Sequence, residues 1–314
     1  MIRILSAVLL AALSVCAAAQ SFPSRPVRLV VGGSPGGGID LVARLLSAPL
    51  QEQLGQPVVV DNRPGASGAI GAEQVHGAAP DGHSLLVGFS GQMVMAPVTQ
   101  PGQSWDPVRD FEPVARVGLF PVLLVVNPSL PVQSVQDLVR HAKANPGKLN
   151  AATGSSGFFY VTEAFKKMTD TDLRDVPFTG SAASVAAVAA GTVDLSFVDI
   201  PPALGQVRAG RLRALGVSTA QRVPSMPEIP AIAESVRGYE FVLWIGLFAP
   251  AGTPKAVIER LHQEIARAVG LPEVREKMLA TGVVPALSTP QEFGEVLRRD
   301  LALVRRLTPA VAAK

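Results

Sequence analysis

The residues that could do chemistry in this chain lie in short loops of glycine and small hydroxyl side chains. The first loop, residues 32–38, contains five glycines and stands between an apolar run, residues 29–31, and a helical apolar pattern that begins near Asp40. A strand, a glycine-rich turn and a helix N-terminus point unpaired backbone N–H groups and the positive end of a helix dipole at the loop, which favours an anion. The sequence therefore predicts half of an anion site here, and a tight turn without a ligand is the alternative.

Two nucleotide-binding motifs are excluded by the residues that follow Gly38. A P-loop requires Lys and then Ser or Thr after its last glycine, whereas Ile39 and Asp40 stand there. A dinucleotide fingerprint requires a glycine three residues after Gly38, and Leu41 occupies that position. The loop is therefore not predicted to bind a nucleotide by either motif.

No complete catalytic or metal-ligand set is apparent in this sequence. Residues 32–36 have the letters G-x-S-x-G, but no serine has an obvious histidine partner, and no pair of histidines has the spacing of a metal site. The histidines are far apart in the sequence: His76, His83, His141 and His262. We therefore predict no catalytic residue, no metal site and no cofactor, and we do not expect an enzyme. A site assembled only by the fold stays an open alternative.

The first 19 residues have the three parts of a secretory signal peptide. Arg3 supplies the positive charge, residues 4–15 form an apolar core that is short for a membrane span, and residues 17–19 are the small alanines that precede cleavage. The sequence thus predicts export to the periplasm and a mature chain without cysteine. Cys16 leaves a lipoprotein as the alternative, although Val15 before it fits that signal poorly.

Charge and composition exclude a nucleic-acid-binding class. The 314 residues carry 28 Lys and Arg against 25 Asp and Glu, and aromatic residues make up 5% of the chain. A chain with scattered basic residues and few aromatic rings lacks the basic stripe and the stacking surface that nucleic acids require. Because the helical patterns show no sustained heptads, we expect a monomer.

Apolar runs, glycine-containing loops and helical patterns alternate along the chain. Runs at residues 29–31, 58–60 and 84–89 are each followed by such a loop, and a second series of this kind begins at residue 120. This rhythm predicts α/β sheets with parallel strands, in which ligands bind beyond the carboxyl ends of the strands. The two series predict two lobes.

The domain boundaries follow from these two series. The helices of the last quarter are expected to pack back on the first lobe, which makes that lobe discontinuous in sequence. The predicted units are the signal peptide at residues 1–19, lobe 1 at residues 20–122 and 227–314, and lobe 2 at residues 123–226. A hinge is expected at the crossover strands, near residues 123–126 and 239–248.

Short motifs occur in a fixed order along nearly the whole chain. They are residues 23–31 (PSRPVRLVV), 35–44 (PGGGIDLVAR), 55–65 (GQPVVVDNRPG), 79–82 (APDG), 105–111 (WDPVRDF), 209–215 (AGRLRAL) and 246–254 (GLFAPAGTP). In this order, over residues 22–309, the chain resembles the substrate-binding receptors of tripartite tricarboxylate transporters, the Bug family of periplasmic proteins. Each motif alone is modest, whereas their order over the full length is specific.

The resemblance implies a two-lobe α/β fold of the periplasmic-binding-protein type, type II-like, with a small carboxylate in the cleft between the lobes. Carried over by position, the lobe 1 residues at the ligand are Ser34, Pro35, Gly36, Gly37, Gly38, Ser67 and Ser90. Those of lobe 2 are Thr153, Ser155, Ser156, Gly157, Phe158, Thr179, Gly180, Ser181 and Asp199. None of these loops contains Lys or Arg, so helix dipoles and oriented N–H groups must supply the positive potential.

Three positions depart from the family pattern, and all three make lobe 2 less polar at the ligand. Phe158 and Phe159 stand where the family usually has a small hydroxyl residue and a histidine, Val198 replaces a common aspartate, and Phe178 replaces a tyrosine. One hypothesis is that Phe158 lines the pocket and favours an acid with an apolar or aromatic body over citrate. The alternative is that both phenylalanines belong to the core.

The expected function is that of a periplasmic solute-binding protein. It would capture a carboxylate by hinge closure and deliver it to membrane transporter subunits. A ligand sensor that docks on a membrane signalling protein is the alternative in a different class, and a periplasmic enzyme that acts on a carboxylate is a third. The sequence names neither the carboxylate nor the membrane partner.

Overall fold

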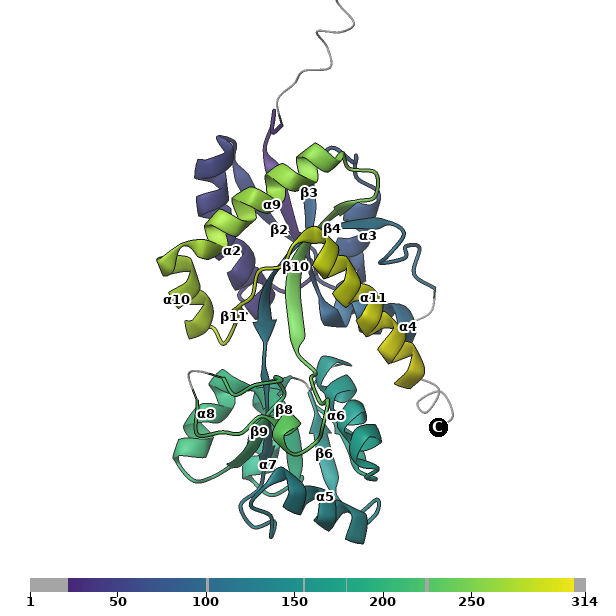
Figure 1. Cartoon of the computed structure of the whole chain (residues 1–314), viewed down its shortest axis with the longest axis vertical. Helices are drawn as coiled ribbons and strands as arrows, with labels where there is room; N and C mark the ends of the chain where they lie inside the picture. The colour runs from purple at the N-terminus through teal and green to yellow at the C-terminus, as the bar shows by residue number, and fades with distance from the viewer. Residues whose placement is uncertain (1–21, 100–101, 155, 179, 224–225, 308–314) are drawn as a thin grey trace, which may run out of the picture.

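The computed structural model describes residues 22–99, 102–154, 156–178, 180–223 and 226–307, which form two lobes along the longest axis of the molecule (Figure 1). Each lobe is built on its own β-sheet with helices packed against it. The strand order is β11-β4-β10-β3-β1-β2 in lobe 1 and β7-β6-β8-β5-β9 in lobe 2. The predicted α/β fold with two lobes is thereby confirmed.

The lobe 1 sheet combines parallel and antiparallel strands. β1 (Val27–Val31), β2 (Val58–Asn62) and β3 (Ser84–Phe89) are parallel, so their carboxyl ends meet at one edge of the sheet. Three further strands complete the sheet: β10 (Leu243–Pro250), β4 (Phe111–Phe120) and β11 (Val284–Pro285). β10 is antiparallel to both β3 and β4, and β11 is antiparallel to β4. The edge formed by β1, β2 and β3 is where a ligand is expected in such a sheet.

Helices bury both faces of the lobe 1 sheet. One core contains apolar residues of α2 (Gly38–Leu54), α9 (Lys255–Gly270) and α10 (Pro272–Ala280). The other contains residues of α3 (Ala69–His76), the π-helical turn η2 (Gly91–Met95) with α4 (Ala96–Thr99) after it, and α11 (Pro290–Leu307). The three helices of the last quarter of the chain, α9, α10 and α11, therefore pack on lobe 1.

Lobe 2 repeats this arrangement around a fully buried strand. All five residues of β5 (Val122–Val126) are buried, and β5 is antiparallel to both β8 (Leu195–Asp199) and β9 (Arg213–Val217). β6 (Asn150–Thr153) lies parallel to β7 (Arg174–Pro177) and to β8. One core includes α5 (Val135–Ala144) and α6 (Ser156–Thr169), and the other includes α7 (Ser181–Ala189) and α8 (Ile200–Arg208).

The chain passes from lobe 1 to lobe 2 at Pro121, between β4 and β5, and returns between β9 and β10. On the return path, Ala231 bridges to Val217, and η3 (Ile232–Glu234) follows it. Ile232 and Tyr239 are fully buried in a lobe 2 core. The boundary expected at residue 227 is therefore too early, because these side chains pack on lobe 2, and we propose the return crossing at Val242.

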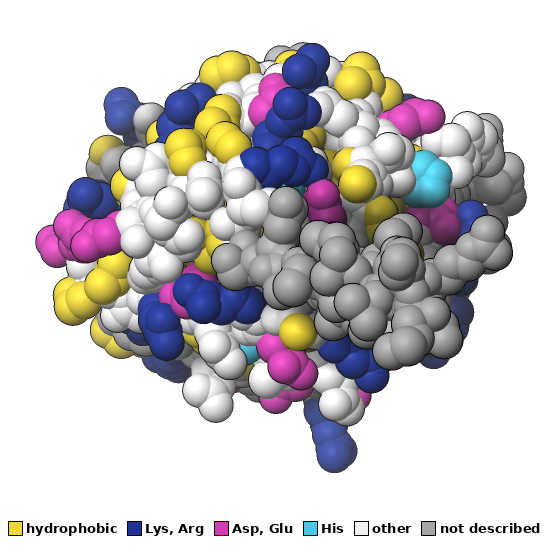
Figure 2. Space-filling view, turned by 90° about the horizontal axis from the view of Figure 1, so that it is seen from above, with side chains coloured by type: hydrophobic (Ala, Val, Ile, Leu, Met, Phe, Trp, Pro, Cys, Tyr) yellow, Lys and Arg dark blue, Asp and Glu magenta, His cyan; other side chains and the backbone are white. Residues whose placement is uncertain are grey.

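Charged side chains of both signs are interspersed on the end of lobe 1 that Figure 2 shows. Exposed ion pairs, such as Arg25 with Asp81 at 2.9 Å, contribute little to stability. Among the described residues, no helix is both long and apolar enough to cross a membrane.

Candidate ligand-binding cleft

A cavity of about 570 Å³ opens between the two lobes. This volume is suited to a small organic molecule. Lobe 1 and the crossing contribute Gly38, Ile39, Leu41, Phe89, Ser90, Gly91, Phe120, Pro121, Leu243, Trp244, Thr281 and Gly282. Lobe 2 contributes Gly157, Phe158, Gly180, Ser181, Asp199, Ile200, Pro201 and Pro202. Residues far apart in sequence thus meet at the carboxyl ends of the parallel strands.

The N-terminus of α2 forms part of the lobe 1 wall. Gly37 is the N-cap in an extended conformation, without a side-chain cap, and the N–H of Leu41 donates to its carbonyl oxygen at 2.9 Å. The described residues provide no acceptor for the N–H groups of Gly38 and Ile39, and both residues line the cavity. Unpaired first-turn N–H groups and the positive end of a 17-residue helix therefore face the cleft.

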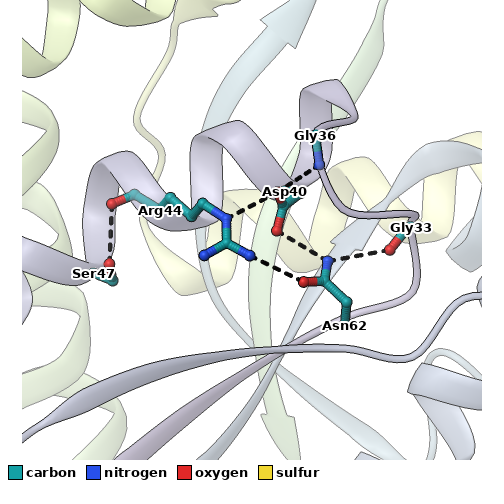
Figure 3. Close-up of polar contacts among 6 residues, drawn as sticks. All are labelled: Gly33, Gly36, Asp40, Arg44, Ser47 and Asn62. Atoms are coloured by element: carbon teal, nitrogen blue, oxygen red, sulfur yellow. Dashed lines mark hydrogen bonds and ion pairs between the residues drawn. The ribbon is translucent and has the colours of Figure 1, made fainter.

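Asp40 fixes the glycine-rich loop from inside (Figure 3). Its carboxylate is 1% exposed and accepts hydrogen bonds from the Gly36 N–H at 2.8 Å, Asn62 Nδ2 at 2.9 Å and Arg44 Nε at 2.9 Å. Burial opposes ionisation of Asp40, but the hydrogen bonds from Arg44, Gly36 and Asn62 outweigh it and hold the pKa of the carboxyl below its ordinary value. Asn62 also donates to the Gly33 carbonyl oxygen at 3.2 Å, so both ends of the loop are tied to one network.

The same network accounts for which loop residues reach the cavity. The Gly36 N–H is already used by Asp40, and Ser34, Pro35, Gly36 and Gly37 are exposed and do not line the cavity. Of the residues predicted in this loop, only Gly38 does. The loop is therefore a support for the α2 N-terminus more than a wall of the cleft.

Glycines allow the loop after β1 to approach both the loop after β2 and the first turn of α3. A Cβ on Gly32 would stand 2.8 Å from Gly68 Cα, and one on Gly71 would stand 3.0 Å from Gly32 Cα. Between them, Ala66 and Ser67 adopt positive φ values of 47° and 56°, and Ser67 does not line the cavity. Ser90, predicted at the ligand, does line it, and its Oγ accepts the Trp244 N–H at 3.3 Å.

Two loops of lobe 2 meet in the same way. The Gly180 N–H donates to the Gly154 carbonyl oxygen at 2.8 Å, and a Cβ on Gly154 would stand 2.6 Å from the Gly180 carbonyl carbon. This contact places Gly180 and Ser181, at the N-terminus of α7, on the cavity wall. Thr153 stays inside the sheet, because its Oγ1 is directed to the Val176 carbonyl oxygen at 3.5 Å.

The start of α6 brings an aromatic ring to the cleft. Phe158 is 5% exposed, lines the cavity together with Gly157, and also packs in a lobe 2 core. The cavity and the core hypotheses for Phe158 are therefore compatible, because this residue lines the cavity and also packs in the core. Ser156 begins this helix, while the predicted Ser155 and Thr179 lie outside the described residues.

Asp199 ends β8 and is the N-cap of α8. Its backbone N–H donates to Ser181 Oγ at 2.8 Å, which joins two predicted site residues. Burial raises the pKa of the Asp199 carboxyl, and a hydrogen bond with Ser181 opposes this rise without cancelling it. Among the described ion pairs none includes Asp199, so its charge has no cationic partner in the cleft.

Apolar and aromatic side chains make up much of the remaining wall. Phe89, Phe120 and Trp244 join Phe158 there, and the described lining residues include no Lys, Arg or His. Sequence reasoning missed these three rings, together with Thr281 and Gly282. Phe89 and Phe120 are the last residues of β3 and β4, and a position at the end of a strand could have indicated that they line the cleft. Gly282 reaches the cleft only because α10, which it follows, packs on lobe 1.

No group of three or more His, Cys, Asp or Glu side chains that could hold a metal ion occurs among the described residues. The described wall includes one carboxylate, that of Asp199, and three hydroxyl groups, those of Ser90, Ser181 and Thr281, and no histidine or lysine. The arrangement can hold an anion at helix N-termini and enclose an apolar body.

Comparison with known proteins assigns the chain to a family. Residues 42–310 match the model of the tripartite tricarboxylate transporter family receptor. Protein BugT of Bordetella pertussis is 35% identical over 280 residues, which cover 87% of this chain and 85% of BugT.

Two solved structures of Rhodopseudomonas palustris proteins are similar over almost their whole length. Rpa4515, solved with adipate, has a TM-score of 0.77 at 34% identity, with 92% of this chain and 98% of that chain covered. MatC (Rpa3494), solved with bound malate, has a TM-score of 0.72 at 30% identity, with 91% and 99% covered. The resemblance predicted from the motifs is confirmed: the chain belongs to the family of tripartite tricarboxylate transporter receptors, the Bug-type periplasmic solute-binding proteins.

Proposed function

We propose that this receptor binds a small carboxylate with an apolar body in the cleft between its lobes and presents it to the membrane subunits of a tripartite tricarboxylate transporter. The observation that carries this proposal is the cleft itself, in which two helix N-termini face a largely apolar cavity of about 570 Å³. The carboxylates bound to Rpa4515 and MatC support the ligand class.

The carboxylate is placed at the N-terminus of α2. The N–H groups of Gly38 and Ile39 face the cavity without an acceptor, and the helix dipole adds positive potential at this end. A carboxylate oxygen accepts such N–H groups as strong, charge-assisted hydrogen bonds. The anion can therefore be held although no Lys or Arg lines the described wall.

The body of the ligand is placed against the rings of Phe89, Phe120, Phe158 and Trp244. Contact with these rings favours hydrocarbon, since apolar surface removed from water contributes about 25 cal/mol per Å². A tricarboxylate such as citrate would have to desolvate further charges against this wall without cationic partners. We therefore propose that a mono- or dicarboxylate with an apolar or aromatic body binds more tightly than citrate.

Capture is proposed to occur by closure of the lobes about the crossings at Pro121 and Val242. Both lobes contribute to the cavity wall, so a ligand that contacts both stabilises the closed state relative to the open one. The proposal also includes export of the chain, with residues 1–19 removed, and a monomeric receptor without catalytic activity.

The experiment combines two measurements on the full mature protein. Native mass spectrometry of receptor purified from its own periplasm is expected to show a monomer without residues 1–19 and with a bound organic acid. Titration calorimetry is then expected to give at least about tenfold tighter binding of adipate than of citrate, a difference of about 1.4 kcal/mol. Tight citrate binding would contradict the apolar-body proposal, and no binding in a broad screen of organic acids would contradict carboxylate capture itself.

A further inference from the structure

Asp199 places a negative charge in a cleft that is proposed to bind an anion. It is the only residue with a formal charge among the described residues that line the cavity. Its backbone is fixed at the junction of β8 and α8, where its N–H donates to Ser181 Oγ at 2.8 Å. This contact positions Asp199 on the lobe 2 wall.

The surroundings of Asp199 do not neutralise this charge. No described Lys, Arg or His forms an ion pair with its carboxylate, unlike Asp40 across the cleft, which has Arg44 at 2.9 Å. The neighbours of Asp199 on the wall are Ile200, Pro201 and Pro202, which cannot donate to it from their side chains. The half-buried Asp199 carboxylate has a hydrogen bond with Ser181, and a donor on the ligand would supply a second one from the cleft.

The two lobes therefore present different groups to the cleft. The N–H groups of Gly38 and Ile39 belong to lobe 1 and can donate to a ligand anion, whereas Asp199 belongs to lobe 2 and repels one. A ligand with carboxylates at both ends would bring like charges together at Asp199. A ligand with a donor at its second end would instead form a charge-assisted hydrogen bond there.

We propose that Asp199 determines specificity by selecting ligands that carry a carboxylate at one end of an apolar body and a hydrogen-bond donor, best a cationic amine, at the other. This inference rests on the proposed function, because it takes the ligand carboxylate to lie at the α2 N-terminus. The Asp199 carboxylate accepts from the donor group, and the aromatic rings of the wall pack against the body between the two ends.

The test uses three ligands that share one chain length: 6-aminohexanoate, hexanoate and adipate. In titration calorimetry at neutral pH, the wild-type protein is expected to bind 6-aminohexanoate roughly tenfold to a hundredfold more tightly than hexanoate, and adipate no better than hexanoate. Asp199→Asn is expected to remove the preference for the amine and to improve adipate binding. Asp170→Asn, at a fully exposed aspartate of the same lobe, removes the same charge and is expected to leave all three affinities unchanged.

The outcomes separate this inference from the proposed function. Adipate binding as tight as, or tighter than, that of 6-aminohexanoate in the wild-type protein overturns the role of Asp199 and leaves carboxylate capture intact. An unchanged preference in folded Asp199→Asn overturns it as well. If Asp199→Asn does not fold, the wild-type comparison of the three ligands still decides. Failure of the wild-type protein to bind any organic acid overturns the proposed function and this inference with it.

Discussion

Gly282 of lobe 1 lies so close to Pro201 of lobe 2 that a Cβ on Gly282 would stand 2.7 Å from Pro201 Cγ. Gly282 follows α10 with a φ of +81°, and Pro201 lies in the first turn of α8. Both residues also line the cavity. The lobes therefore touch at the rim of the cleft through a position that only glycine fits, in space and in backbone conformation.

We predict that Gly282→Ala weakens ligand binding by holding the lobes apart. The added methyl group would collide with the Pro201 ring, so that closure of the lobes becomes less favourable than in the wild-type protein and apparent affinity falls. A loss of roughly tenfold corresponds to about 1.4 kcal/mol. Titration calorimetry with adipate measures the loss.

A matched control separates the collision from backbone strain. Gly252 has a φ of +83° and nothing within 4 Å of its would-be Cβ, so Gly252→Ala imposes the same strain without a contact between lobes. It is expected to cost about 1 kcal/mol of stability with unchanged affinity. Pro201→Ala in the Gly282→Ala background is expected to restore part of the affinity. Equal affinities of the two glycine variants would contradict the closure contact.

The α2 N-terminus can be tested by removing a single N–H group. Gly38 is the first helical residue, and Gly37 before it has φ −74° and ψ 163°, which a following proline accepts. Gly38→Pro is therefore expected to keep the helix and to weaken carboxylate binding roughly tenfold or more, because one donor to the anion is lost. Gly38→Ala keeps the N–H, adds only a methyl group and is expected to retain most of the affinity; equal losses in calorimetry would refute the N–H contact.

The fold was largely predictable because its elements carry local signals. The apolar run at residues 84–89 coincides with β3, and the alternation of strands, glycine loops and helices indicated two α/β lobes. β4 was missed, since its residues do not form one apolar run and include the polar Glu112 and Arg116. The return crossing was placed too early, because burial of Ile232 and Tyr239 in lobe 2 depends on long-range packing.

The sequence predicted site residues in the loops after the strands, but not the aromatic residues and the glycine that complete the cavity wall. Gly38, Ser181 and Asp199 lie in loops that the sequence marks, and the structure brings them to one cavity. Ser34 and Gly36 are in such a loop as well, yet Asp40 draws the Gly36 N–H inward, a contact that requires the three-dimensional position of Asn62. Trp244 and Gly282 reach the cleft through a crossing strand and a packed helix, for which no local motif exists.

Trp244 provides a direct signal of ligand binding. It lines the cavity, while its indole Nε1–H donates to Asp300 Oδ2 at 2.9 Å and its backbone N–H to Ser90 Oγ at 3.3 Å. Since the protein has only two tryptophans, we predict that adipate changes the intrinsic fluorescence through Trp244. The response is expected to persist in Trp105→Phe and to disappear in Trp244→Phe. A response lost with Trp105, which packs on Phe111 away from the described wall, would contradict this placement.

Asp40 is predicted to stabilise the fold in a pH-dependent way and to support binding indirectly. Because the pKa of its carboxyl is lowered in the folded state, its contribution is complete above the ordinary value of 3.8 and is lost as the pH falls through the lowered one. Asp40→Asn is expected to cost about 1–3 kcal/mol at neutral pH. In urea unfolding, the difference from the wild-type protein should shrink as the pH is lowered below 3.8.

Asp137 provides the matched control for this variant. Its carboxylate accepts the Gln133 N–H at 3.1 Å at the start of α5, it also has a lowered pKa, and it does not line the cavity. Asp137→Asn is therefore expected to lower stability alone. Asp40→Asn is expected to lower ligand affinity too, because the Gly36 N–H bond that holds the loop before α2 is weakened. If both variants lose stability and neither loses affinity, Asp40 supports only the fold and not the anion-binding N-terminus of α2.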